Sequence, residues 1–202
     1  FSRRQIRAPR TVVIGEVVRR LHSMLHRLIG EHIEVTLTLD PEEDAVRADV
    51  GQIEQIIMNL VINARDAIEE TGEIGISTAT KRFDDGESVQ GLPLRAGRYV
   101  VLSVSDNGTG IPAEIEDQLF EPFFSTKPAG RGSGLGLSTV YGIVKQNEGF
   151  VFFESEEGSG TVFTVYLPSI GPPEETAEEE TAPSRAKSVG ADPGAILVVE
   201  DE

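Results

Sequence analysis

The spacing of apolar residues predicts two helices and one strand in the first 72 residues. Between residues 11 and 28, apolar side chains recur every three or four positions and Gly30 follows, so we expect a helix over 11–28. Residues 33–39 alternate apolar and polar side chains, which is typical of a strand. Helical spacing returns after Asp49, a suitable N-cap, and predicts a second helix to about Glu70, with Gly72 as its stop.

Strand patterns dominate the second half of the chain. Alternating apolar residues predict strands at 74–80, 99–105, 150–154 and 161–167, and a helix follows a glycine-rich loop at 133–146. The resulting order is helix, strand, helix, strand, strand, helix, strand, strand. That order predicts an α/β fold, a two-layer sandwich in which a mixed sheet packs on about three helices.

Composition narrows the class of protein. The 202 residues are 39% hydrophobic, enough for a buried core, and carry a formal net charge of −16. Such an acidic chain does not suit nucleic-acid partners, which bind basic surfaces. The chain contains no cysteine, which excludes disulfides and Cys-ligated zinc, and no apolar run of the length that spans a bilayer. We therefore expect an acidic domain that works in the cytoplasm.

The negative charge is concentrated toward the C-terminal end. Residues 171–202 carry a net charge of −7, against −9 for residues 1–170. The stretch 171–194 is rich in Pro, Glu, Thr and Ala, and we interpret it as a flexible acidic linker. An apolar run and three acids follow at 195–202, a pattern typical of the first strand of a second, truncated domain. The main domain is therefore expected at 10–170.

Two asparagines stand four positions apart in the apolar second helix, so Asn59 and Asn63 share one helix face. Asparagine is a mediocre helix former and costs free energy when it is buried without a partner. Its amide oxygen is a hard ligand that suits Mg²⁺. Hydrogen bonds from the asparagines to neighbouring backbone explain the pair equally well, and this segment alone leaves both interpretations open.

A second candidate lies just after the strand 99–105, where Asp106 enters a turn that contains Gly108, Gly110 and Ile111. A carboxylate at this point could accept a hydrogen bond from the exocyclic amine of a ligand, while the glycines let a ligand ring approach the backbone. An ordinary Asp-Asn-Gly turn between two elements is the alternative.

A glycine-rich segment opens the third helix, with glycines at the alternate positions Gly130, Gly132, Gly134 and Gly136. Such a segment leaves backbone N–H groups free to bind phosphate at a helix N-terminus, and it also suits a hinge. The spacing does not fit G-x-G-x-x-G, and the chain has no Gly-Lys-Ser/Thr, so this is neither a dinucleotide fingerprint nor a Walker P-loop.

Three phenylalanines lie in the loop just before the glycine-rich segment, at Phe120, Phe123 and Phe124. They predict a segment that packs when the loop closes, or one that simply anchors a long loop in the core. Lys127 and Arg131 follow, and their positive charges suit a polyphosphate.

The motifs occur in the order N-x-x-x-N, D-x-G-x-G, F-x-P-F and G-x-G-x-G within residues 10–168. Each is weak alone, but the ordered set resembles the ATP-binding catalytic domain of sensor histidine kinases, in the superfamily that includes gyrase and MutL. The resemblance implies a Bergerat-type α/β sandwich that binds ATP and Mg²⁺ beneath a mobile lid. It also implies a histidine protein kinase that acts in a two-component phosphorelay.

The resemblance also assigns roles to single residues. Asn63 and Asn59 become the candidate Mg²⁺ ligands, and Asp106 becomes the ligand of the adenine amine. Asn59, Lys127 and Arg131 are the candidate catalytic residues, the last two as lid cations. The remaining positions assigned to the nucleotide are Gly108, Gly110, Ile111, Gly132, Ser133, Gly134, Leu135, Gly136, Leu137 and Thr161.

One position separates phosphate transfer from hydrolysis. ATP-hydrolysing relatives keep a glutamate four residues before the magnesium asparagine, where this chain has Asn59. An amide cannot accept a proton from water, so the resemblance favours transfer to an acceptor histidine. None of the three histidines, His22, His26 and His32, lies in the family's acceptor motif. The spacing of His22 and His26 also suits a metal pair, but a surface position beside the apolar stripe is the favoured interpretation.

The two ends of the chain suggest partners. Residues 1–9 resemble the end of the family's dimerisation and phosphoacceptor helix, and residues 195–202 resemble the first strand and acidic pocket of a receiver domain. The expected partners are an upstream dimerisation domain and a downstream receiver, in a homodimeric parent that binds no nucleic acid. A nucleotide-gated protein-binding module and a Ser/Thr kinase of the anti-sigma type are the alternatives.

Overall fold

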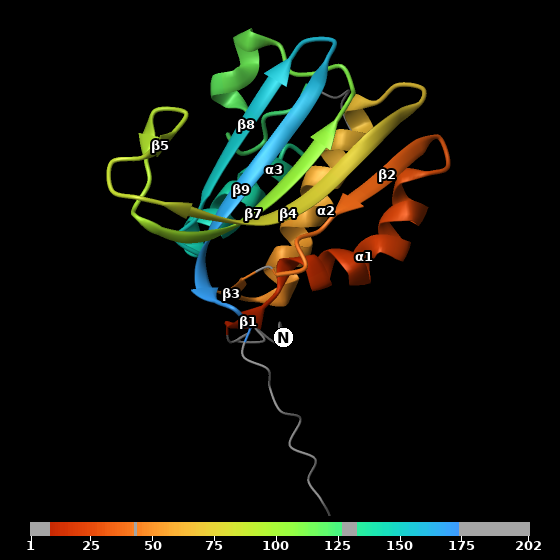
Figure 1. Ribbon diagram of the computed structural model, residues 1–202. Coiled ribbons are helices and arrows are strands. Elements are labelled where there is room, and N and C mark those ends of the chain that lie inside the picture. Colours follow the sequence, from red (N-terminus) through yellow and green to blue (C-terminus); the bar gives the residue numbers. More distant parts are fainter. Residues whose placement is uncertain (1–8, 43, 127–132, 174–202) are drawn as a thin grey trace, which may run out of the picture.

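The computed structural model describes residues 9–42, 44–126 and 133–173, which form a twisted sheet and a layer of helices (Figure 1). In these residues the main sheet has seven strands in the order β1-β3-β9-β7-β4-β2, with β8 beside β9. The strands are β1 (Arg10–Val12), β2 (Ile33–Thr38), β3 (Ala45–Ala48), β4 (Gly72–Phe83), β7 (Gly97–Asp106), β8 (Phe150–Glu156) and β9 (Gly160–Gly171). A small separate hairpin joins β5 (Ser88–Val89) and β6 (Leu92–Pro93).

The sheet is mixed, as predicted. Strands β2 and β4 are parallel, and the other paired strands run antiparallel. The last residue of β7, Asp106, lies between Ile74 of β4 and Thr161 of β9. The pairing therefore brings Asp106 and Thr161, which are 55 positions apart in the chain, together at one end of the sheet.

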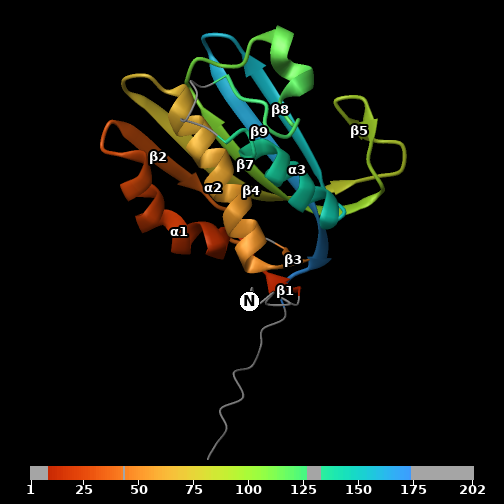
Figure 2. The same cartoon turned by 180° about the vertical axis from the view of Figure 1, so that it is seen from behind.

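Three α-helices of the described residues cover one face of the sheet (Figure 2): α1 (Ile14–Ile29), α2 (Val50–Ala67) and α3 (Gly136–Gln146). Helix α2 lies between the other two. Its Ile56 and Leu60 are fully buried, because the apolar residues of α2 recur at helical spacing and face the sheet. Asp49 caps α2 as predicted, since its Oδ1 accepts a hydrogen bond from the Gln52 N–H at 3.2 Å.

The two faces of the sheet are packed differently. Alternate residues of β7 point to opposite sides, so Val100 and Leu102 join the core beneath the helices. Tyr99 points to the other face, where it belongs to a smaller cluster with Phe83 and Tyr166. The outer face is therefore covered only around this cluster, and its other residues in β4 and β7 are half-buried or exposed.

The start of the first helix differs from the prediction. The helix was expected to start at residue 11, but residues 11 and 12 pair with β3 as part of strand β1, and the helix begins at Ile14. Strands β1, β3, β5 and β6 and the 3-10 helix at Ala113–Gln118 were not predicted, because such short elements show no clear periodicity.

The other two helices are shorter than expected. Helix α2 ends at Ala67 rather than near Glu70, because Ile68 adopts an extended conformation and buries its side chain. Helix α3 begins at Gly136 rather than at residue 133, so the glycine-rich segment largely precedes it.

Some predictions concern residues outside the described ranges. These are the expected dimerisation helix within 1–8, most of the linker and the receiver strand within 174–202, and the site candidates Lys127, Arg131 and Gly132. Within the described ranges, no helix combines the length and the apolar character needed to cross a bilayer.

Candidate functional site

The asparagine pair of α2 lies against the first turn of α3. The Nδ2 of Asn59 donates a hydrogen bond to the Gly136 carbonyl oxygen at 3.2 Å. A Cβ added at Gly136 would lie 3.9 Å from the Asn63 Nδ2 and 4.0 Å from the Asn59 Oδ1, so both side chains border this glycine. Both asparagines are half-buried. The fold thus joins two sequence motifs, N-x-x-x-N and the glycine-rich segment.

The Asp106 carboxylate is held by backbone donors at the end of β7. Its Oδ1 accepts a hydrogen bond from the Gly108 N–H at 2.9 Å, and the Thr161 N–H donates a second bond to the carboxylate. Burial raises the pKa of Asp106 above its ordinary value, and the two hydrogen bonds oppose that rise. Two backbone donors orient the carboxylate, and none of the described residues forms an ion pair with it.

Gly108 is required by the close approach of this loop to α2. The Thr109 N–H donates a hydrogen bond to the Ala67 carbonyl oxygen at 2.9 Å. A Cβ at Gly108 would lie 2.5 Å from the same oxygen and 2.8 Å from the Ala67 Cβ, far inside van der Waals contact. The glycine therefore locks the Asp106 loop onto the helix that carries the asparagines. Its role beneath an adenine base stays a prediction.

Gly110 and Ile111 fix the other side of the loop to the β8–β9 hairpin. Gly110 has a φ of +70°, and a Cβ there would overlap the carbonyl oxygen of Glu156. The Ile111 N–H donates to the Ser155 Oγ at 2.9 Å, and that oxygen lies 2.9 Å from the Thr161 Oγ1. Thr161 is only 4% exposed.

Ser155 thus connects two predicted site residues, Ile111 and Thr161, and sequence reasoning missed it. A single serine carries no motif signal. Its position directly opposite Thr161 in the β8–β9 register was the signal that could have revealed it, because the intervening glycine-containing turn implies a hairpin.

The phenylalanine segment contacts the glycine-rich segment through its backbone. The Phe123 N–H donates to the Gly134 carbonyl oxygen at 2.9 Å, and Gly134, at φ +66°, leaves no room for a Cβ beside the Phe123 backbone. Phe120 anchors the loop, with its ring 5.6 Å from that of Tyr141 and 6.2 Å from that of Phe153. The Phe123 side chain is 77% exposed. Core anchoring therefore applies to Phe120, and Phe123 is left exposed.

The first turn of α3 has backbone N–H groups that could bind an anion. Its N-cap residue, Leu135, makes no side-chain cap hydrogen bond. The Leu135 N–H itself donates to the Ser133 Oγ at 3.3 Å, and Leu137 packs against the core. Within the described residues, the first turn of α3 is therefore uncapped by side chains, as in helix N-termini that bind anions.

Comparison with known proteins identifies the family of this domain. Residues 48–170, more than half of the chain, match the family of histidine kinase-, DNA gyrase B-, and HSP90-like ATPases. The chain belongs to this family. The sensor kinase CckA of Brucella abortus is 41% identical over 207 residues, which cover 100% of this chain and 22% of that protein. The chain thus spans about a fifth of the length of this relative.

Solved histidine-kinase structures share the fold of this ATPase-family domain. The mycobacterial sensor histidine kinase MprB matches with a TM-score of 0.63 and 26% identity, over 81% of this chain and 99% of that one. The catalytic domain of histidine kinase ThkA matches with a TM-score of 0.56 and 31% identity, over 77% of this chain and 90% of that one. These matches confirm the predicted α/β sandwich and the family recognised from the motifs.

The two candidate Mg²⁺ ligands of this ATPase-family domain, Asn59 and Asn63, are amides. In the described ranges, no three His, Asp or Glu side chains gather as a metal cluster. The rings of His22 and His26 on α1 lie 6.4 Å apart in an edge-on arrangement. The neutral oxygens of Asn59 and Asn63 suit Mg²⁺, an ion that takes few protein ligands and completes its shell with water and phosphate.

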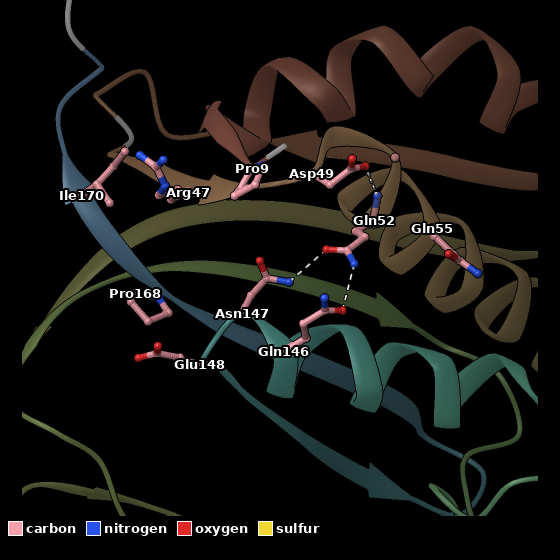
Figure 3. Close-up of a pocket in the computed structure, with 11 residues that line it drawn as sticks. Pro9, Arg47, Asp49, Gln52, Gln55, Gln146, Asn147, Glu148, Pro168 and Ile170 are labelled. Atoms are coloured by element: carbon pink, nitrogen blue, oxygen red, sulfur yellow. Dashed lines mark hydrogen bonds between the residues drawn. The ribbon is translucent and has the colours of Figure 1, made fainter. Parts of the chain in front are cut away.

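A cavity of about 600 Å³ lies at the opposite, N-terminal end of α2 (Figure 3). Gln52 links two helices there, because its Nε2 donates to the Gln146 Oε1 at 3.0 Å and its Oε1 accepts from the Asn147 Nδ2 at 3.3 Å. The residues that line this cavity include none of the predicted site residues. This cavity therefore lies where the N-terminal end of α2 meets the C-terminal end of α3, and it is distinct from the candidate site.

Proposed function

We propose that this domain binds Mg-ATP and transfers the γ-phosphate to a histidine of a dimerisation domain. The observation that carries the proposal is the convergence of three motifs on the C-terminal half of α2: the Asn59–Asn63 pair, the Asp106 loop and the first turn of α3. Relatives that match this domain are named sensor kinase and histidine kinase, which supports the same reaction class.

The proposed nucleotide spans these motifs. Asp106 accepts a hydrogen bond from the adenine amine, and Thr161 lies beside it, held by Ser155. The phosphates extend toward the uncapped N-terminus of α3, an 11-residue helix whose dipole favours negative charge. Lys127, Arg131 and Gly132 would contribute positive charge and backbone contacts from the lid.

Asn63 and Asn59 would hold Mg²⁺, which when bound offsets the negative charge of the polyphosphate. The Asn59 Nδ2 donates to Gly136, so the Oδ1 is the atom of that amide available to a cation. Neither atom of a side-chain amide accepts a proton from water near neutral pH. We therefore expect slow ATP hydrolysis and transfer to an acceptor that another domain brings in.

The resemblance of residues 1–9 to a dimerisation helix and of residues 195–202 to a receiver strand supports two partner domains for phosphate transfer. The histidine would belong to an upstream dimerisation domain in a homodimeric parent, and the phosphate would pass to a receiver domain downstream. We further expect this phosphorelay to operate in the cytoplasm, where ATP is supplied.

Calorimetric titration with ATP and Mg²⁺ tests nucleotide binding. We expect the chain to bind Mg-ATP and Asp106→Asn to lose that binding, because the adenine amine loses its charged acceptor. Asp117→Asn is the matched control, since Asp117 is an exposed acid on the 3-10 helix. A chain that binds no Mg-ATP would overturn the proposal, and an Asp106→Asn variant with unchanged affinity would overturn the role of Asp106.

Labelling of the parent protein with γ-phosphate-labelled ATP tests transfer. We expect an acid-labile, base-stable phosphoryl group on an upstream histidine, and its loss in Asn63→Ala. Firm nucleotide binding with no labelled histidine would refute the kinase proposal. It would favour a nucleotide-gated binding module.

A further inference from the structure

Helix α1 presents a basic face on the outside of an acidic protein. The helix lies at the edge of the helix layer, on the far side of α2 from α3 (Figure 2). Its inner side is buried, while Arg19, Arg20 and Arg27 are exposed. The one acidic residue of the helix, Glu16, is exposed on the same face, which leaves that face with a net positive charge. These three arginines lie within one third of the helix circumference, because their spacing places them at similar angles.

The three arginines have no anionic partner within the described part of the chain. The ion pairs there involve other arginines, such as Arg98 with Asp44 and Arg65 with Asp66. Beside them, Met24 is 47% exposed. Arginine and methionine are enriched in protein–protein interfaces, and lysine, which α1 lacks, is depleted there. The face therefore has the composition of a binding surface, and its charge selects an anionic partner.

We propose that this basic face of α1 binds residues 174–180 of the same chain. That segment, Glu-Glu-Thr-Ala-Glu-Glu-Glu, carries five carboxylates and no cation. The overall charge of −16 repels polyanions such as nucleic acids and anionic membranes, whereas a tethered segment cannot diffuse away. The inference concerns a surface remote from Asn59 and Asp106, and it does not depend on nucleotide binding.

The path of the chain brings the segment to this face. Gly171, the last residue of β9, pairs with Ala45 of β3, and β3 pairs with β1. Strand β1 ends at Val12, two residues before α1 begins. Two strand spacings separate β9 from β1, about 10 Å. Residues 172–180 extend over as much as about 30 Å at about 3.3 Å per residue, which is sufficient to reach the whole row of arginines.

The spacing of the glutamates in residues 174–180 also matches the spacing of the arginines along α1. Arg19 and Arg27 are eight positions apart on the helix, about 12 Å at 1.5 Å per residue. Glu174 and Glu178 are four positions apart, about 13 Å when the chain is extended. Bound in this way, the segment would direct the chain that follows residue 180 along α1, on the side of the domain away from α3 and the lid.

Paramagnetic relaxation in the full chain tests the proposal. The sequence has no cysteine, so Ala177→Cys provides a single site for a nitroxide label. We expect selective broadening of the backbone amide signals of α1 around residues 19–27. The broadening should disappear in salt of about 0.5 M, where the screening length falls to a few ångströms. It should also disappear when Arg19, Arg20 and Arg27 are changed to Gln.

The matched control changes Arg47, Arg82 and Arg95 to Gln, three exposed arginines outside α1, two of which line cavities at the α3 end of the domain. The control variant should keep the broadening at α1. Broadening that is centred on residues 95–98 and 145–149 and lost in the control variant would overturn the proposal in favour of that surface. Uniform or absent broadening would overturn it as well.

Discussion

Two glycines of the candidate site respond oppositely to the same small change. In Gly108→Ala, the new Cβ meets the Ala67 carbonyl oxygen at 2.5 Å, the carbonyl carbon at 2.7 Å and the Cβ at 2.8 Å. Two of these atoms belong to the helix backbone and cannot rotate away, so the loop and α2 must separate by several tenths of an ångström. In Gly136→Ala, the nearest atoms lie at 3.9 Å, which is ordinary contact.

The structural difference translates into opposite stability changes. Overpacking at Gly108 should lower the free energy of unfolding by about 1–3 kcal/mol. Alanine at Gly136 should leave it unchanged or raise it by up to about 1 kcal/mol, since alanine is the better helix former. In a domain of this size, 1 kcal/mol shifts the melting temperature by about 2–4 °C.

Urea denaturation followed by circular dichroism measures both changes, with the slope of the transition as a check that the unfolded state is unaltered. A Gly108→Ala variant as stable as the unaltered chain would contradict this expectation. So would a Gly136→Ala variant that loses as much free energy of unfolding as Gly108→Ala. Calorimetry with Mg-ATP on the same samples should show weaker binding in Gly108→Ala, because the Asp106 loop moves with the glycine.

Three further changes test the fixed groups around the site and the sheet. Burial raises the pKa of Asp106 in the folded state above its ordinary value of 3.8. The protonated carboxyl therefore contributes its full stability below pH 3.8, and this contribution is lost as the pH rises through the folded-state pKa. The difference in unfolding free energy between Asp106→Asn and the unaltered chain should therefore shift in favour of Asp106→Asn as the pH rises from about 3 to about 7. Denaturant titrations measure this difference, and a shift in favour of the unaltered chain would contradict the expectation. Ser155→Ala removes the acceptor of the Ile111 N–H and should cost about 1–2 kcal/mol in urea unfolding, whereas an unchanged midpoint would show that water replaces the hydroxyl. Arg98→Met leaves the Asp44 carboxylate, which is 1% exposed, without its cation. A loss of about 3 kcal/mol is expected from thermal unfolding, at the low end for a buried pair because the Arg98 side chain is 50% exposed, and Arg82→Met should change nothing comparable.

Local patterns in the sequence were sufficient for the helices and long strands. The 3.6-residue period placed Asn59 and Asn63 on one face, and Asp49 at the start of α2 is a cap whose partner, Gln52, lies three residues away. The order of four short motifs was enough to recognise the family that the comparison with known proteins confirmed.

Contacts between distant segments could not be read in this way. Strand β1 looked like the start of a helix because only its pairing with β3, more than 30 residues away, makes it a strand. Ser155 carried no signal of its own, and its value lies in the two residues that converge on its hydroxyl.

The sequence by itself therefore determined the elements, their order and the types of side chain available to a nucleotide, because periodicity, caps and motifs act over a few residues. Only the tertiary structure decided that Gly108 must be glycine because Ala67 lies against it, and that Asn59 meets Gly136. It also decided that the arginines of α1 face outward without partners in the described residues. Those facts depend on which segments the paired strands and the packed helices bring together, and a linear pattern contains no distance between them.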